Sequence, residues 1–304
     1  MSDQPSLRRG HSYYEASSRG RLAHLLDAGS FQELLGPTER HVSPHLESLG
    51  QPCAFDDGIV IGRGRLNGEP VLVASQEGGF MGGAVGEVHG AKLTGLLELA
   101  LGERPTAVIL LLESGGVRLH EANAGLIAIS EIIRALLAAQ AAEIPVLGLI
   151  GGVYGCFGGM GIVARCCNSL IINEEGRLGL SGPDVIETTM GVEEFDASDR
   201  ALVWRTVGGK HRYLLGEVEN LVIDDIAAFR QAVIALLDQP SPALSLEILE
   251  REHQALALRL ANYAHCRDAS EIWRLQGFEN PLQLPLLDIP SFLQVASSVS
   301  REDS

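Results

Sequence analysis

A buried strand that runs into a glycine turn and then into an apolar helix occurs twice in this sequence, and this pattern constrains the fold most. Residues 106–112 (TAVILLL) predict such a strand, which is followed by a double glycine and an apolar helix over 124–140. Residues 144–152 (IPVLGLIGG) predict the second strand, followed by a short helix over 158–168. Strands that alternate with helices in this way predict an α/β fold.

The flanking sequence predicts further elements on both sides of these units. The turn LNGE (66–69) separates two apolar stretches and predicts a β-hairpin. Glycine-rich residues 78–90 lead into a helix, and helices dominate from about residue 226. We therefore expect three parts: an N-terminal helical segment and loop (1–57), an α/β core (58–238), and a linker with a C-terminal helical tail (239–304). The N-terminal helix is expected within 17–36, and the linker is QPSP at 239–242.

Composition argues against several classes of function. The 304-residue chain has a net charge of −16 and no cluster of lysine and arginine, which argues against a nucleic-acid partner. Its five cysteines show no CxxC spacing, so we expect neither a zinc site nor a disulfide framework. The N-terminus has no apolar stretch of signal-peptide length, and apolar stretches elsewhere are interrupted by Gly and Glu. We expect a cytoplasmic protein that neither spans a membrane nor binds a metal on this chain.

The glycine pairs themselves suggest a site. The first N–H groups of a helix have no partner within it, and the helix dipole makes that end positive. Glycine lets another group approach these amides closely. Gly115 and Gly116, together with Gly158, Gly159 and the amide of Met160, therefore predict a site for a phosphate or an oxyanion. The alternative is that these glycines only allow strands and helices to pack closely.

Other glycine motifs explain these turns less well. The segment GCFGGMG (155–161) lacks the GxGxxG spacing of a dinucleotide site, and the GK[ST] of a P-loop is missing. Ser114 lies in LESGG instead of the GxSxG of a nucleophile elbow, so we expect it to shape the turn rather than attack a substrate. Glu113 is expected to orient the same turn.

Four motifs in order along the chain resemble the β-type acyl-CoA carboxyltransferases, a family that includes subunits of acetyl-CoA and propionyl-CoA carboxylases. ESGGVRLHEA (113–122) is similar to their D/E-S-G-G-A-R-x-x-E segment, and GLSGPDVIETTMG (179–191) to their G-x-x-G-P-x-V-I-E segment. Segments 78–101 and 193–204 resemble the β subunits of malonate decarboxylases within that family. The resemblance covers roughly residues 17–225. It implies a crotonase-like fold of repeated ββα units, with an N-terminal helix and a C-terminal helical tail.

The resemblance also implies an activity and partners. Such a β subunit converts malonyl-S-acyl carrier protein to acetyl-S-acyl carrier protein and CO2, with the enolate oxygen held by the amides of Gly115 and Gly116. The implied partners are a γ subunit with a second crotonase-like half, a malonyl-/acetyl-ACP transferase subunit, and an acyl carrier protein that bears a phosphoribosyl-dephospho-CoA prosthetic group. No cofactor is expected on this chain. Because the sequence ends at residue 304 without a second crotonase-like half, we expect another polypeptide to supply half of the site.

Two other functions stay open at this point. One is a carboxyltransferase subunit that passes the carboxyl group to biotin on a separate protein, and the other is a non-catalytic subunit that docks the carrier protein. None of the four methionines precedes a lysine, so this chain is not expected to carry biotin itself. Only Cys53 precedes residue 156, so the four-cysteine zinc ribbon of many acetyl-CoA carboxylase β subunits is missing, which argues against that enzyme.

The resemblance gives roles to side chains near the motifs. Arg118 either binds the malonyl carboxylate or the carrier phosphate, or forms an ion pair with Glu121 on a helix surface. Lys92 either meets a phosphate of the pantetheine arm or is a solvated helix lysine. The backbone of 158–160 is expected to hold the thioester arm or to complete the pocket.

The remaining reactive side chains are less promising. Tyr154, water and a partner residue are equal candidates for the proton donor to the enolate. His89 and His120 are tempting acid–base groups. Both lie among helix-forming residues with no evident partner, so we expect neither to be catalytic. Cys166 and Cys167 are expected to pack in the core.

Overall fold

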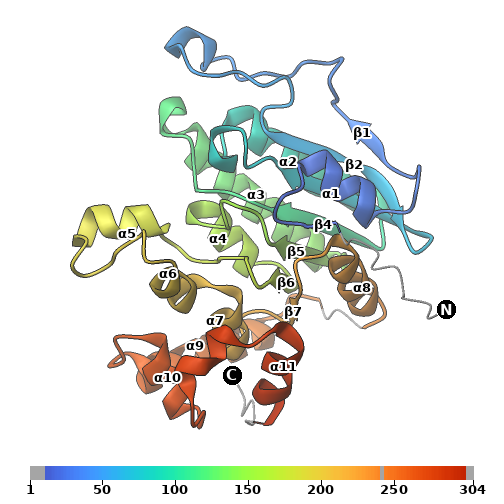
Figure 1. Ribbon diagram of the computed structural model, residues 1–304. Helices are drawn as coiled ribbons and strands as arrows, with labels where there is room; N and C mark the ends of the chain where they lie inside the picture. The colour runs from blue at the N-terminus through green and yellow to red at the C-terminus, as the bar shows by residue number, and fades with distance from the viewer. Residues whose placement is uncertain (1–10, 240–242, 299–304) are drawn as a thin grey trace, which may run out of the picture.

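The computed structural model describes residues 11–239 and 243–298, and within these residues it contains one seven-stranded sheet (Figure 1). The strands lie side by side in chain order. The first three are antiparallel, and every pair from β3–β4 to β6–β7 is parallel. The strands are β1 (Gln32–Leu34), β2 (Ile59–Leu66), β3 (Glu69–Gln76), β4 (Ala107–Leu112), β5 (Val146–Ile150), β6 (Ser169–Asn173) and β7 (Asn220–Val222).

The predicted hairpin is formed by β2 and β3. Asn67 and Gly68 connect the two strands and have φ angles of 53° and 84°. A two-residue turn with positive φ at both positions follows the right-handed twist of the strands, and Asn-Gly is the sequence that favours it. The hairpin prediction is confirmed.

Helices cover both faces of the sheet. α1 (Ser18–Leu25) and α8 (Ile226–Leu237) pack on one face, and α2 (Glu87–Glu103), α3 (Ala124–Ala141) and α4 (Gly158–Arg165) pack on the other (Figure 1). The central strands are therefore buried on both sides, and all six residues of β4 are buried. The apolar segments that predicted β4, β5, α3 and α4 form these elements.

Short segments that follow the strands add a second layer of pairing. Isolated parallel bridges join Val85 to Val117, Ser114 to Cys156, and Cys156 to Leu178. Each unit is therefore a long strand, a short extended segment and a helix. This arrangement agrees with the crotonase-like fold of ββα units that the motifs imply.

One sequence expectation about membranes needs correction. α3 is long and apolar enough to cross a bilayer by length and composition, although the sequence was expected to hold no such stretch. Its apolar face, which includes Ile132, Ala135 and Leu136, is buried in the core cluster that it shares with α2 and α4. The hydropathy of α3 is that of a core helix packed on a sheet.

The C-terminal part is helical, as predicted. The buried side chain of Trp273 on α10 (Ala269–Leu275) donates a hydrogen bond to His211 on α7 (Gly209–Leu214), with 3.2 Å between Nε1 and Nδ1. Residues 240–242 of the predicted linker lie outside the described residues, as do 1–10 and 299–304, and the division into three parts stays a prediction. The remaining helices of the described chain are α5 (Pro183–Met190), α6 (Arg200–Val207), α9 (Leu246–Tyr263) and α11 (Ile289–Ser298). Short 3-10 turns lie at η1 (Glu47–Leu49), η2 (Met81–Gly83), η3 (Leu119–Glu121) and η4 (Pro281–Leu286).

Candidate active site

The two glycine turns singled out in the sequence meet in the structure. The amide of Ser114 donates to the carbonyl of Gly155 at 2.8 Å, and the amide of Phe157 donates back to the carbonyl of Ser114 at 2.8 Å. A Cβ atom on Gly158 would lie 2.9 Å from the Cα of Gly116. The backbones of the two turns are thus in direct contact, and a side chain at Gly158 would push them apart.

The amides of the first turn are not equivalent. The N–H of Gly115 donates to the carbonyl of Gly82 at 2.8 Å. One of the two predicted oxyanion donors is therefore already used in a hydrogen bond within the protein. The N–H of Gly116 has a longer contact of 3.2 Å with the hydroxyl of Ser114, which itself donates to the Gly116 carbonyl. Ser114 shapes the turn in this way. Gly116 has a φ of +137°, and a Cβ there would meet nothing within 4 Å. The space beside its Cα atom is therefore open, whereas its amide is held within the turn by the Ser114 hydroxyl.

The second turn leads directly into α4. The Gly158 amide donates to the carbonyl of Leu180 at 2.8 Å. The amides of Gly159 and Met160, in the first turn of α4, have no acceptor among the described residues. Met160 is fully buried, whereas Gly158 and Gly159 are half-buried, so Gly159 is the more accessible of the two residues with free amides. Free amides and the helix dipole together make this end of α4 suitable for an anion.

The first turn differs from the predicted strand–turn–helix geometry. α3 begins only at Ala124, and Val117, Arg118 and η3 come between Gly116 and that helix. The Gly116 carbonyl accepts from the Val85 amide at 2.9 Å, which holds the intervening segment extended. The dipole of α3 therefore does not act at the glycine pair, and α4 is the helix that provides this effect.

Of the two roles expected for Arg118, the structure shows the ion pair, although in a buried position instead of on a helix surface. Its side chain is buried, and its two terminal nitrogens donate to Asp57, to Oδ1 and to the carbonyl oxygen, both at 2.7 Å. Glu121 is 3.6 Å from the same guanidinium, so the ion pair foreseen on a helix surface is a secondary and buried contact. The guanidinium also lies 5.1 Å from the ring of Phe80. Asp57 was not anticipated as the partner because it lies far away in sequence.

Lys92 and His89 are core residues of α2. The Lys92 ammonium donates to the carbonyls of Asp56 and Ile59 at 3.0 and 2.6 Å, and burial lowers its pKa. Lys92 is therefore not the solvated helix lysine that was one of its two expected roles, and its ammonium is occupied by main-chain carbonyls. Burial also holds the pKa of His89 well below its ordinary value, with Nε2 of His89 3.0 Å from the amide nitrogen of Gln76. A neutral buried imidazole agrees with the expectation that His89 is not catalytic.

The other reactive side chains divide between core and surface. Cys166 and Cys167 pack against the core cluster, as predicted, and burial raises the pKa of both thiols. His120 is exposed on η3. Tyr154 is 45% exposed beside the glycine turns, so it stays a candidate proton donor. In the described part of the chain, no three His, Cys, Asp or Glu side chains lie close enough together to hold a metal ion.

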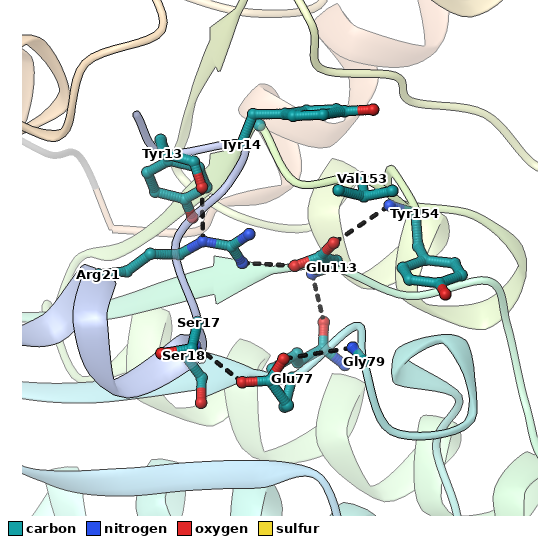
Figure 2. Close-up of polar contacts among 12 residues, drawn as sticks. Tyr13, Tyr14, Ser17, Ser18, Arg21, Glu77, Gly79, Glu113, Val153 and Tyr154 are labelled. Carbon is teal, nitrogen blue, oxygen red and sulfur yellow. Dashed lines mark hydrogen bonds and ion pairs between the residues drawn. The ribbon is translucent and has the colours of Figure 1, made fainter. Parts of the chain in front are cut away.

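Glu113 joins the turn to its surroundings, and Figure 2 shows it between two other segments. Its carboxylate accepts from Arg21 on α1 at 2.5 Å and from the Tyr154 amide at 3.1 Å. Its own amide donates to the Gln76 side chain at 3.0 Å. Sequence reasoning identified Glu113 as an orienting residue but missed Arg21. The available signal was an arginine on the same face of the N-terminal helix as Leu25 and Ser18.

Comparison with known proteins then identifies the family. The pattern of the carboxyl transferase domain matches residues 11–233, most of the chain and both glycine turns. The chain belongs to the carboxyl transferase family. This carboxyl transferase chain is 40% identical over 306 residues to the malonyl-S-ACP:biotin-protein carboxyltransferase MADC of Malonomonas rubra, covering 94% of this chain and 95% of that protein.

Solved structures of carboxyl transferases agree with the fold. A chain in the crystal structure of a Pseudomonas malonate decarboxylase hetero-tetramer in complex with malonate is 41% identical and superimposes with a TM-score of 0.79, over 88% of this chain and 98% of that chain. The 12S transcarboxylase structure with methylmalonyl-coenzyme A bound is 26% identical, with a TM-score of 0.63, and this chain spans 41% of it. The crotonase-like α/β fold is thereby confirmed.

Proposed function

We propose that this chain is the subunit of a malonate decarboxylase that removes CO2 from a malonyl thioester on an acyl carrier protein. The chain resembles both a malonyl-S-ACP carboxyltransferase and a malonate decarboxylase subunit over nearly its whole length. In both cases a malonyl group loses its carboxyl group. The observation on which the proposal depends is the contact between the Gly116 turn and the first turn of α4.

The reaction breaks the bond between the α-carbon and the carboxylate carbon of the malonyl group. The electron pair of that bond moves to the α-carbon and the thioester carbonyl oxygen, CO2 leaves, and the α-carbon of the enolate later takes a proton. The amides of Gly116, Gly159 and Met160 are the donors that we assign to the developing negative charge. Loss of one such donor typically costs about 2.7–4 kcal/mol of transition-state stabilisation.

A second subunit is part of the proposal. The similar Pseudomonas chains were crystallised in a hetero-tetramer and in an MdcD–MdcE hetero-dimer. Large apolar side chains are exposed on the second glycine turn, on the segment that pairs with it and on the helix that follows, namely Val153, Tyr154, Leu180 and, on α5, Val185 and Met190. We propose that a γ subunit with a second crotonase-like fold covers them and completes the site. The same proposal includes a transferase subunit, a carrier protein with a phosphoribosyl-dephospho-CoA group, and a cytoplasmic location.

Carboxyl transfer to a biotin protein is the second candidate, favoured by the 40% identity to the Malonomonas carboxyltransferase. The two reactions share the step that breaks the carbon–carbon bond and differ in where the carboxyl group goes. A direct decarboxylase releases CO2 without biotin. A carboxyltransferase needs a biotinylated protein as acceptor.

The test is CO2 release from malonyl-S-acyl carrier protein by the reconstituted complex, with and without avidin. We expect acetyl-S-carrier to accumulate at the same rate in both reactions. Strong inhibition by avidin, or turnover only after a biotinylated acceptor is added, would instead establish the carboxyltransferase. No turnover of the malonyl thioester under either condition would reject both candidates.

A further inference from the structure

The carboxylate of Glu113 is a point where three segments of the site meet. Oε2 accepts from Arg21 on α1, and Oε1 accepts from the amide of Tyr154 in the loop before α4. A Cβ atom on Gly78 or on Gly152 would collide with this carboxylate, so both loops pack their backbone directly against it. Figure 2 shows Arg21 and the Tyr154 amide on either side of the Glu113 side chain.

Glu113 therefore sets the spacing of both glycine turns. Its main chain leads directly into Ser114 and Gly116, while the Tyr154 amide that it accepts belongs to the segment that pairs with Ser114. Gln76 fixes the Glu113 amide from β3. A change in the direction of this one carboxylate would shift the Gly116 amide relative to the first turn of α4.

Arg21 fixes the direction of that carboxylate. Its side chain is buried, its Nη1 is 2.5 Å from Glu113 Oε2, and its Nε donates to the Tyr13 carbonyl at 2.9 Å. The guanidinium carbon lies 4.5 Å from the centre of the Tyr13 ring. The guanidinium is thus held on two further sides by the chain that precedes α1, and the planar arginine fork suits such fixed contacts better than lysine does.

α1 also reaches the third segment. The Ser18 amide donates to Glu77 at 2.9 Å, and the same carboxylate accepts from the amide of Gly79 at 3.2 Å (Figure 2). The loop of 77–80 in turn leads to Gly82, whose carbonyl accepts from Gly115. α1 therefore contacts the site from two directions through polar groups, although it provides no group that faces the open space at Gly116.

We propose that Arg21 is a positioning residue for the active site and acts through Glu113, so that docking of α1 sets the distance between the two glycine turns. This inference rests on the proposed function in so far as those turns hold the reacting thioester. A buried ion pair adds little net stability compared with well-packed apolar residues of similar size. Its directional hydrogen bonds, in contrast, fix geometry, and misplacement of a catalytic group by about 1 Å can cost about 100-fold in rate.

The experiment compares Arg21→Met with Arg19→Met in the reconstituted complex. Arg19 lies on the same helix and also forms ion pairs, with Glu33 and Asp56, but its side chain is 37% exposed and does not contact Glu113. We expect Arg21→Met to lower kcat by about 100-fold with KM little changed, and Arg19→Met to leave both close to wild type. Arg21→Lys keeps the charge but not the fork, and we expect it to restore part of kcat.

Hydrogen exchange supplies a readout that does not depend on the reaction. In Arg21→Met the amides of 151–157 should exchange faster, because Tyr154 loses a fixed acceptor, while Arg19→Met should leave them unchanged. This measurement needs no substrate, so it tests the inference even if the proposed decarboxylation is wrong. Unchanged exchange in a folded Arg21→Met chain would overturn the inference.

A double variant separates positioning from stability. Arg21→Met leaves Glu113 as an unpaired buried carboxylate, whereas Arg21→Met with Glu113→Gln removes both charges. We expect the double variant to recover thermal stability but not kcat, because neither change restores a directed contact on the turn. Recovery of kcat together with stability would show that the pair serves only to keep the chain folded, and would overturn the inference.

Discussion

Glu113 and Arg118 lie at the two ends of the Ser114–Gly116 turn and attach it to different parts of the protein. Glu113 faces Arg21 on α1, whereas Arg118 faces Asp57 just before β2. Both ion pairs are buried, and neither contacts the open space at Gly116. The turn is thus held at both ends by charged groups, while the residues between them provide backbone amides.

Gly116 and Gly115 allow a matched test of the assigned donors. Gly116→Ala places a methyl group at a φ of +137° on the residue whose amide is assigned to the enolate, whereas a methyl group in Gly115→Ala meets only the Gly82 carbonyl at an ordinary 3.5 Å. We expect Gly116→Ala to lower the decarboxylation rate by about 100-fold and Gly115→Ala to leave it close to wild type. Steady-state rates of the assembled complex provide the measurement.

The control for this pair is stability. Alanine at positive φ is strained, by roughly 1–3 kcal/mol, so the melting temperature and assembly with the partner must be measured in parallel. If an assembled Gly116→Ala complex turned over at the normal rate, the glycines would serve packing alone. An equal loss of decarboxylation rate in both variants would indicate that the Gly115 amide is also a donor to the enolate.

The Asp57–Arg118 pair predicts a large effect on stability. Asp57 has a φ of 57°, a conformation that asparagine tolerates, so Asp57→Asn removes the charge without straining the backbone. Arg118 would then be a buried cation whose remaining carboxylate, Glu121, lies at 3.6 Å. We expect the free energy of unfolding to fall by about 3–5 kcal/mol, measured by urea denaturation.

Glu175→Gln is the matched surface change. Its partner Arg200 is 65% exposed, so loss of this ion pair should change the free energy of unfolding by less than about 1 kcal/mol. Comparable losses from Asp57→Asn and Glu175→Gln would contradict the role assigned to the buried pair.

At the scale of helices and strands, the sequence predicted local structure well. Apolar segments predicted β4, β5 and α3, and the Asn-Gly pair predicted the hairpin, because the residues that form each of these patterns lie close together in the sequence. The partner Asp57 of Arg118 was missed because it lies 61 residues earlier, and Arg21 was missed because Glu113 lies 92 residues later. Burial of a charged residue depends on which elements pack together, and a local sequence pattern does not reveal this packing.

The contact between α7 and α10 predicts a dependence of stability on pH. Burial, with the nearby Arg212, lowers the pKa of His211 from 6.5 to about 3. Between these values the unfolded chain binds a proton that the folded chain does not, so the free energy of unfolding falls as the pH falls. The slope from this group is about 1 kcal/mol per pH unit below pH 6.5.

His211→Asn tests this dependence. Asparagine can still accept from the Trp273 indole but does not titrate, so urea denaturation between pH 7 and 5 should show a shallower slope, by about 1 kcal/mol per unit. His120→Asn, on the exposed η3, serves as the control. If wild type and His211→Asn showed parallel slopes, the imidazole would not be buried in its neutral form.

At the scale of the whole molecule, the glycine turns border the surface of the chain, with Gly116 buried just beneath it. Gly115 is exposed, and Leu180 on the adjoining segment is 69% exposed. A site that excludes water strengthens every electrostatic contact in it. An uncovered turn would therefore stabilise an enolate poorly.

This surface predicts that the chain depends on a partner. Purified alone, it should release CO2 from a malonyl thioester slowly, and addition of the γ subunit should restore turnover. The measurement is CO2 release at increasing concentrations of γ, with a Leu180→Asp chain as the variant in which docking is weakened. Full activity of the isolated chain would contradict the need for a second half of the site.

The order of the strands also has a consequence for how the chain folds. Because each strand pairs with the next one along the chain, the sheet can grow by one unit at a time without long loops closing first. The N-terminal segment is the exception: Ser12 bonds Asp224, 212 residues away, and the Tyr13 ring stacks on Phe229 of α8. We therefore expect the glycine turns to fold before the segment that leads into α1 packs against α8. The contacts of Arg21 would then form late in folding.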